Sequence, residues 1–426
     1  MASDTIFALS SGRPPAAISI IRVSGPDAHS AAMEIAGGLP SARTAAVREL
    51  RHPVSGELLD EGLVLRFDAP ASSTGEDIAE FHCHGGRAVV AALLEAFGTI
   101  DGLRPALPGE FTRRAFENGR IDLTEAEGLA DLIEAETQSQ RKAALALADG
   151  RLRKQVALWQ ERTLALSADA ERAIDYDEDD EGMDPSLLRQ CELLASELQR
   201  WADQPRIEFL RDGVLVVIAG PPNAGKSSLI NMIAGEDRAI VTDIPGTTRD
   251  HIEVPLSLGG VPIRLTDTAG LRETTDLIEA IGVERSGRLV DAADVLVWLG
   301  GQADAPEHPR AIVVHSKSDL PDRAAAPAGS LAVSSMTGEG LGGLLAAIEK
   351  LAREVLPAED AIALNRRQAA LIAEAAGGLR EAASVRDVVI AAENLRVARN
   401  AFDRLTGRAG VEDVLDALFG RFCLGK

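Results

Sequence analysis

The chain has 426 residues, too many for one hydrophobic core, and this length predicts two to three domains. Its 66 acidic and 44 basic residues give a net charge of −22, which argues against a protein that coats nucleic acid non-specifically. The three scattered cysteines exclude a disulfide framework, and the N-terminus lacks the pattern of a secretion signal. No apolar run reaches the roughly eighteen residues that cross a bilayer. We therefore expect a cytoplasmic protein with no membrane segment.

Residues 1–118 alternate short apolar strands with a helical stretch and with Gly and Pro turns, which predicts an α/β domain. We expect strands over Ala17–Val23, Leu63–Phe67 and Ile78–Phe81, and a helix over Ala88–Phe97. The tripeptide His82-Cys83-His84 suggests a metal site, but alternation along a strand would turn the thiol away from both histidines. We therefore expect structural or substrate-shaping roles for these three residues.

Two stretches rich in alanine and leucine, 119–210 and 357–426, predict an all-α domain that is discontinuous in sequence. The helical pattern runs from Thr124 to about Ile174, from Pro185 to Trp201 and from Ala358 to Leu418. Thr124–Glu127 matches a capping box at the start of the first helix.

Two charged segments lie within this helical part. The acidic run 175–181 is expected to be a solvated connection, with a metal site as the alternative. The densest basic stretch could meet phosphates or an acidic partner, or could be a solvated helix face; it comprises Arg141, Lys142, Arg151, Arg153 and Lys154.

Residues 211–356 interrupt the helical pattern with an apolar run, Val214–Ala219, that leads into Gly220-Pro-Pro-Asn-Ala-Gly-Lys-Ser227. This is the spacing of a phosphate-binding loop that opens a helix, so we expect an inserted Ras-like P-loop domain with a mostly parallel sheet. Backbone N–H groups of such a loop surround phosphate oxygens, its lysine supplies positive charge and its serine coordinates Mg²⁺. The nucleotide contacts expected in this loop are Asn223, Ala224, Gly225, Lys226, Ser227 and Ser228.

Three later segments indicate GTP. Thr242–Asp250 resembles a switch that senses the terminal phosphate, and Leu265–Gly270 ends a strand with an acid that can hold Mg²⁺ through water. The segment 316–319 supplies an aspartate that can accept hydrogen bonds from guanine, although Ser316 stands where GTPases usually have Asn, which predicts weaker base affinity. The GTP-binding residues expected in these segments and in the loop that closes the base pocket are Thr242, Thr247, Thr248, Asp267, Thr268, Ala269, Gly270, Lys317, Asp319, Ser334 and Ser335.

Hydrolysis needs an oriented water, and Leu271 occupies the position where many small GTPases place a water-orienting glutamine. The polar group must then come from the segment that follows. Glu273, Asp276 and Glu279 are the candidates, and each could instead be an ordinary solvated carboxylate.

Cys423 lies in a short C-terminal segment beside Gly425 and the cationic Lys426. A nearby positive charge favours the thiolate and so a reactive thiol. An ordinary tail cysteine is equally compatible with this pattern.

Three motifs together resemble the bacterial tRNA-modification GTPase family MnmE, also called TrmE. They are the phosphate loop, the Gly246–Asp250 switch and the terminal Phe422-Cys-Leu-Gly-Lys426. The terminal motif decides the resemblance, because other GTPases with this loop share the first two. Thr74–Asp77, His84–Gly86 and Pro108–Phe111 also match the family pattern, so the resemblance extends over the whole chain.

The resemblance implies a K⁺-stimulated GTPase in which the cation replaces an arginine finger. K⁺ would be held by Asn223, Thr242, Ile244 and Thr247, and Mg²⁺ by Ser227 and Thr248. The family pattern selects Glu279 as the group that orients water and gives Cys423 a catalytic role. It also implies a one-carbon folate of the 5-formyltetrahydrofolate kind, bound by residues that could otherwise form surface ion pairs: Arg22, Glu80, Arg120 and Lys426.

The implied function is GTP hydrolysis that drives modification of the wobble uridine of certain tRNAs at carbon five, of the carboxymethylaminomethyl or aminomethyl type. The family acts as a homodimer, with an MnmG-type partner that uses flavin and NADH. The main alternative is a switch-type GTPase of ribosome assembly or RNA binding, which would need neither a reactive terminal cysteine nor a folate site. A scaffold with a degenerate nucleotide site is disfavoured because Lys226, Ser227, Thr248 and Asp267 are all present.

Overall fold

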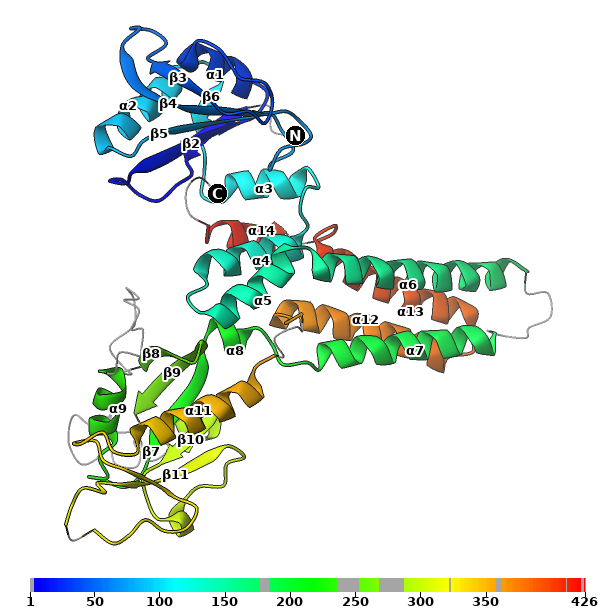
Figure 1. Cartoon of the computed structure of the whole chain (residues 1–426). Coiled ribbons are helices and arrows are strands. Elements are labelled where there is room, and N and C mark those ends of the chain that lie inside the picture. The colour runs from blue at the N-terminus through cyan, green and yellow to red at the C-terminus, as the bar shows by residue number, and fades with distance from the viewer. Residues whose placement is uncertain are drawn as a thin grey trace, which may run out of the picture. The chain divides into compact units, whose positions relative to one another are not determined.

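The computed structural model describes residues 4–176, 184–235, 253–267, 287–321, 323–357, 362–410, 412–422 and 425. The chain forms two compact units, Met1–Ala130 with Leu147–Ala165 and Arg399–Lys426, and Asp131–Ala146 with Leu166–Ala398. The predicted fold class is confirmed: an N-terminal α/β part, helices before and after residues 211–356, and a second, mostly parallel sheet in that segment (Figure 1). No described helix combines the length and the apolar composition that a membrane span needs.

The first unit contains a six-stranded sheet in the order β3-β4-β5-β2-β1-β6, in which only the β1–β6 pair is parallel. Alternate residues of β2 and β5, including Ile21, Val23 and Phe81, are buried in one cluster with residues of α1 and α2. This alternation is what a half-buried strand requires. The elements are β1 Thr5–Leu9, β2 Ile18–Ser24, α1 Ala28–Ala36, β3 Ala46–Arg51, β4 Leu58–Phe67, β5 Ile78–His84, α2 Arg87–Gly98, β6 Leu103–Pro105 and α3 Glu110–Glu117.

The opposite face of this sheet is covered by α3 where β1 lies, because Ile6 and Ala8 of β1 pack against Phe111. Arg114 of α3 is buried and forms ion pairs with Asp4 at 2.9 Å and Glu76 at 3.1 Å. A hydrogen bond from Arg104 holds the pKa of Asp4 below its ordinary value. A carboxylate with a lowered pKa stabilises the fold above its unfolded pKa, and this contribution is lost as the pH falls.

The helical pattern predicted from Thr124 to Ile174 corresponds to three helices. The predicted capping box at Thr124–Glu127 is wrong by two residues, because Asp122 caps α4 instead. Glu125 N donates to Asp122 Oδ1 at 3.0 Å, and Asp122 N donates to Glu125 Oε2 at 2.8 Å. The helices of this part are α4 Leu123–Glu134, α5 Gln138–Ala148, α6 Arg151–Tyr176, α7 Pro185–Ala202, α8 Glu208–Arg211, α12 Arg366–Ser384, α13 Val388–Thr406 and α14 Glu412–Phe419.

Helices α7 and α12 pack side by side in the second unit (Figure 1). Leu187, Leu194 and Leu198 of α7 are buried, as are Ile372 and Leu379 of α12. These helices flank residues 211–356 in sequence, so their packing makes that segment an insertion between two helical neighbours. In the first unit, Trp159 of α6 stacks on Phe402 of α13 with ring centroids 6.2 Å apart.

Residues 211–356 fold around a sheet whose described strands have the order β12-β11-β10-β7-β9-β8, in which only the β8–β9 pair is antiparallel. Its central strands are apolar runs, as expected for strands buried on both faces. One buried cluster joins them to α9 and α11. The elements are β7 Val214–Ala219, α9 Lys226–Ala234, β8 Glu253–Leu258, β9 Val261–Asp267, β10 Val295–Trp298, the 3₁₀ turn Gln302–Asp304, β11 Ala311–Ser316, β12 Leu331–Val333 and α11 Leu341–Val355.

We predict that Arg114→Met destabilises the N-terminal sheet by about 3 kcal/mol, because it leaves two carboxylates without their buried partner. The side chain of Arg114 is 3% exposed, whereas that of Arg113 is 45% exposed. Arg113→Met is therefore the control and should cost less than about 1 kcal/mol. Amide hydrogen exchange of β1 and α3 measures both, and equal effects would contradict the assignment of Arg114 as the buried anchor.

Candidate nucleotide and N-terminal sites

The nucleotide motifs lie at the carboxyl ends of neighbouring parallel strands. β7 leads into the phosphate loop, β9 ends at Asp267, and β11 ends at Ser316, the first residue of the base motif. β7 pairs in parallel with both β9 and β10, and β10 pairs with β11. In the sheet, β9 lies on one side of β7 and β10 lies on the other. Open α/β sheets bind ligands at the carboxyl ends of the strands, at the point where successive strands change side in this way.

The backbone of the phosphate loop is left-handed at Asn223 and Gly225, a conformation that asparagine and glycine tolerate. Gly225, the N-cap of α9, has φ 95°, and Asn223 has φ 62°, a left-handed conformation that asparagine tolerates better than most residues. A Cβ on Gly220 would lie 2.8 Å from Leu299 O, so only glycine fits this position without a shift. Lys226 is buried and donates to Gly220 O at 2.9 Å and Pro221 O at 3.0 Å. Ala224 is half-buried, and Ser228 lies exposed in the first turn of α9.

The two described residues that were expected near Mg²⁺ lie together. Ser227 Oγ donates to Asp267 Oδ2 at 2.7 Å, although the two residues are 40 positions apart. A hydroxyl and a carboxylate are oxygen ligands of the kind that Mg²⁺ takes. This pair therefore fits a divalent cation beside the helix N-terminus that would hold phosphate.

The base motif contacts the phosphate loop through Ser316. Ser316 Oγ donates to Ala224 O at 2.7 Å, which ties the loop after β11 to the phosphate loop. Lys317, with φ 59°, lies near Gly225, and Asp319 is exposed and open to a ligand. Ser334 is buried, and its hydroxyl accepts from Met336 N at 3.2 Å and Thr337 N at 3.1 Å, so it holds the turn that carries Ser335.

Several expected site residues lie outside the described residues. They are Thr242, Ile244, Thr247, Thr248, Thr268, Ala269, Gly270, Glu279, Cys423 and Lys426, with the alternatives Glu273 and Asp276. The acidic run from residue 177 onward also lies there.

A second polar group lies on the N-terminal sheet, on the face that carries α3. Arg22 Nε donates to Glu80 Oε1 at 2.8 Å, and the two residues are cross-strand partners of β2 and β5. The Arg22 guanidinium lies 5.7 Å from the centroid of the Phe111 ring. Near Glu80, at 3.6 Å, is His82 Nε2, which is buried and has no hydrogen-bond partner. Sequence reasoning did not assign Phe111 to a site, although Pro108–Phe111 matched the family pattern, and it expected a structural or substrate-shaping role for His82.

The contacts of Arg120 and of Gly425 lie toward opposite ends of the β1–β2 pair in the first unit. The Arg120 side chain packs over Gly75, in the loop whose Thr74 hydrogen-bonds Ser24 of β2 at 2.8 Å. At the end of β1, Ser10 Oγ donates to Gly425 O at 2.8 Å across 415 positions of sequence. Ser10, which holds Gly425, lies two positions along the chain from Ala8, the β1 partner of Arg22.

The structure supports a structural role for Cys83. Its thiol is buried and donates to Ser19 O at 3.4 Å, whereas His84 is exposed and pairs with Asp60 at 2.7 Å. Burial raises the pKa of Cys83 to about 11, and the Asp60 charge adds to this shift. A thiol that keeps its proton is a poor metal ligand.

The five residues of the basic stretch are all exposed, and Arg153 is paired with Glu125 at 2.9 Å.

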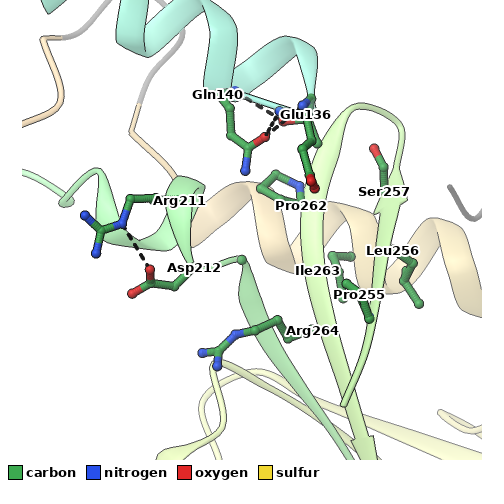
Figure 2. A pocket seen from close by; sticks show the side chains of 12 residues that line it. Glu136, Gln140, Arg211, Asp212, Pro255, Leu256, Ser257, Pro262, Ile263 and Arg264 are labelled. Carbon is green, nitrogen blue, oxygen red and sulfur yellow. Dashed lines mark hydrogen bonds and ion pairs between the residues drawn. The ribbon is translucent and has the colours of Figure 1, made fainter. Parts of the chain in front are cut away.

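A small cavity lies in the second unit, beside the β8–β9 hairpin and the starts of α5 and β7 (Figure 2). Gln140 Oε1 accepts from Glu136 N and Thr137 N, and Gln140 Nε2 donates to Leu210 O at 2.9 Å. One side chain thus caps α5 and holds the segment that leads into β7. The cavity is lined by the end of β9 opposite Asp267, so it is separate from the nucleotide site.

A phosphate loop, a Ser–Asp pair for a metal and an aspartate-bearing base motif on one sheet edge define a P-loop GTPase. Two family models match the chain: one described as GTP-binding protein TrmE N-terminus covers residues 5–120, and one described as MnmE helical domain covers residues 123–423. The chain belongs to the MnmE family of tRNA modification GTPases. It is therefore a GTPase that takes part in tRNA modification.

Individual relatives agree over the full length. A tRNA modification GTPase MnmE of Erythrobacter litoralis is 52% identical over 426 residues, 99% of this chain and 100% of that protein. One of Rhizorhabdus wittichii is 50% identical over 430 residues, 100% of this chain and 97% of that protein. Among solved structures, the G domain of the T. maritima FeoB iron transporter is 26% identical and covers 33% of this chain and 98% of that chain, with a TM-score of 0.24.

We predict that Ser316→Ala weakens GDP binding about five- to tenfold, because the base loop loses its hydrogen bond to the phosphate loop. Ser318→Ala is the matched control, since the Ser318 hydroxyl is buried without a hydrogen-bond partner and its removal should change affinity little. Isothermal titration with GDP measures both variants. Equal affinities of the Ser316→Ala variant and the wild type would mean that the Ser316–Ala224 contact does not support the bound nucleotide.

Proposed function

We propose that this protein is a K⁺-stimulated GTPase that modifies the wobble uridine of certain tRNAs at carbon five. The product would be of the carboxymethylaminomethyl or aminomethyl type, a one-carbon tetrahydrofolate would be the donor, and a flavin-dependent partner of the MnmG type would act with it in the cytoplasm. The observation that carries this proposal is the contact of Gly425 with Ser10, two positions from Ala8, which is the cross-strand partner of the Arg22 that pairs with Glu80. A GTPase that only switches has no need for such a second site.

The nucleotide site supports the first half of the proposal. Lys226 is already directed at the interior of the phosphate loop, where its charge would meet phosphate oxygens. Ser227 and Asp267 would hold Mg²⁺, joined by Thr248, and Asp319 would accept from guanine. Glu279 would orient the attacking water. Hydrolysis at this site would power rearrangement of the protein and would not itself form the new bond.

K⁺ would supply the positive charge that balances charge developing on the phosphates. Asn223 is exposed in the loop and has a left-handed backbone, and its amide oxygen would face the cation. The other proposed ligands are the Thr242 and Thr247 side chains and the Ile244 carbonyl. An oxygen-only set suits a hard cation.

We predict that GTP turnover is at least about tenfold faster in K⁺ than in Na⁺, and that Asn223→Ala removes most of this difference by deleting one cation ligand. Asn231→Ala, at an exposed position of α9, is the matched control and should keep the K⁺ preference. Phosphate release in each salt is the measurement. A wild type that does not distinguish the two ions would refute the cation mechanism while leaving the GTPase assignment intact.

The N-terminal group has the chemistry that a folate needs. A pterin ring is flat and carries donors and acceptors on its edge, and the Glu80 carboxylate, the unpartnered His82 Nε2 and the Phe111 face are complementary to it. Arg22, Arg120 and Lys426 would meet the glutamate carboxylates. When bound, the folate would supply the one-carbon unit, and Cys423 would act beside it. The surrounding residues would bind and orient the ring.

An uncovered apolar face supports homodimerisation through the N-terminal domain, residues 1–118. One face of the sheet carries Val47, Leu63 and Ile20. Val47 pairs with Leu63, and both Leu63 and Ile20 pair with His82. Ile18, two positions before Ile20, lies on the same face. The exposed fractions are 54% for Val47, 40% for Leu63 and 61% for Ile18. Such a patch favours a protein partner over solvent.

We propose 119–210 and 357–426 as the helical domain, with 211–356 as the GTP-binding domain.

Nucleoside analysis of tRNA tests the whole proposal. A strain that lacks the gene should lose the modified wobble uridine, the wild-type gene should restore it, and Cys423→Ser should fail to restore it because the thiol is needed at the N-terminal site. Cys191→Ser is the control, since Cys191 is buried within α7. Unaltered wobble uridines in the deletion strain would favour the switch-type GTPase instead.

A further inference from the structure

The Thr74–Asp77 motif forms a loop that β2 and α3 hold from two sides. Ser24 Oγ of β2 donates to Glu76 Oε2 at 2.8 Å and so accepts from the buried Thr74 hydroxyl, also at 2.8 Å. Arg114 of α3, itself buried, donates to the same Glu76 oxygen at 3.1 Å. These contacts fix the motif to the sheet and to the helix, but they do not require a glycine at its second position.

Gly75, the second residue of the motif, makes room for the stem of the Arg120 side chain. Its φ of 82° lies in the left-handed region, and a Cβ there would lie 2.9 Å from Asn118 Cβ and 3.2 Å from Arg120 Cγ. Asn118 Nδ2 donates to Thr74 O at 2.8 Å, which holds the two segments against each other. The Arg120 stem therefore lies on a surface that a side chain at position 75 would obstruct.

The backbone of Arg120 is fixed by the end of α3. Gly119 has φ 67°, its N–H donates to Phe116 O at 2.9 Å, and Arg120 N donates to Ala115 O at 2.8 Å. These two hydrogen bonds are those of a Schellman motif, which satisfies the last carbonyls of a helix. Arg120 is nevertheless exposed, so its charged end is open to a ligand.

This seat lies beside the polar group of the N-terminal sheet. Ser24, which anchors Thr74, is two positions from Arg22 on β2, so both side chains leave the same face of the strand about 7 Å apart. Arg22 donates to Glu80 at 2.8 Å. Two guanidinium groups near one site suit a ligand that carries carboxylates, because a guanidinium can bind a carboxylate through two parallel hydrogen bonds.

We propose that Gly75 is a positioning residue, which seats the Arg120 stem and so aims the Arg120 guanidinium at a carboxylate of the ligand bound beside Arg22. Gly75 acts through Arg120 and makes no contact with the ligand. The inference rests on the proposed function only for the identity of that ligand, a folate with its glutamate tail. The seat itself is a property of the loop and of α3.

Amide hydrogen exchange of the full chain tests the seat without any ligand. The Cβ of Gly75→Ala should push Asn118 and the Arg120 stem away from the loop, so we expect exchange in 72–77 and 115–121 to become at least about threefold faster. Gly37→Ala is the matched control, because Gly37 also has a positive φ, 66°, but a Cβ there meets nothing within 4 Å. Unchanged exchange of both segments in Gly75→Ala would overturn the seat.

Ligand titration tests the positioning role. The affinity of Gly75→Ala for 5-formyltetrahydrofolate should be about five- to tenfold weaker than that of the wild type, through loss of a well-placed charged hydrogen bond. A 5-formyltetrahydropterin without the glutamate tail should bind both proteins equally, because it offers Arg120 no carboxylate. Equal losses for the two ligands would overturn the positioning role, since they would show that the variant distorts the whole site.

A double-mutant cycle assigns the effect to Arg120. In an Arg120→Gln background, Gly75→Ala should cause no further loss of folate affinity, because the guanidinium that the seat aims is gone. A full additional loss would overturn the inference. Asn118→Ala removes the hydrogen bond to Thr74 O and should weaken folate binding in the same selective way, which keeps the test decisive even if Gly75→Ala does not fold. A wild type that binds neither ligand would refute the folate assignment and with it the task of Arg120, while hydrogen exchange would still decide on the seat.

Discussion

The packing of α7 against α12 is the constraint on which the arrangement of the second unit depends. These helices lie on either side of a segment of about 150 residues, and their contact fixes where that segment begins and ends. Ile207 N donates to Leu364 O at 3.0 Å, so the segment that leads into the GTP-binding part and the segment that leaves it are hydrogen-bonded to each other. Closing a loop costs entropy only once, and this cost rises slowly with loop length. An inserted domain can therefore be large without weakening the helical pair that carries it.

The phosphate loop follows from a local constraint of a different kind. The loop must turn from β7 into α9 within six residues while its amides point inward, which requires left-handed backbone at Asn223 and Gly225. Lys226 stabilises the turn by donating to two carbonyls of its own loop. The ammonium group of Lys226, whose positive charge would meet the phosphates, is thus hydrogen-bonded by backbone oxygens of the loop itself. Preorganisation of this kind lowers the cost of ordering the site when a nucleotide arrives.

Features that depend on neighbouring residues could be predicted from the sequence, whereas contacts between distant segments could not. The strand before the phosphate loop and α7 were predicted nearly to the residue, and a helix was expected directly after the loop, because their apolar period and glycines are local. The Asp122 cap was missed because Asp122-Leu-Thr-Glu125 and Thr124-Glu-Ala-Glu127 are overlapping boxes that local pattern cannot separate. The Ser10–Gly425 contact spans 415 positions, and no periodicity encodes it. Arg22 and Glu80 were singled out by resemblance to a family, and their cross-strand pairing gives that choice a geometric reason.

Ser316 illustrates how a motif can lose a residue type and keep one of its contacts. An asparagine carries an acceptor and two donors, whereas serine has one hydroxyl on a shorter side chain. That hydroxyl reaches Ala224 O at 2.7 Å, so the link between base loop and phosphate loop does not require an amide. Any further hydrogen bond that an asparagine amide would make has no counterpart in serine. In the proposed function, discrimination for guanine would then rest on Asp319, whose exposed carboxylate could accept two hydrogen bonds from guanine and would find no such donor pair on adenine.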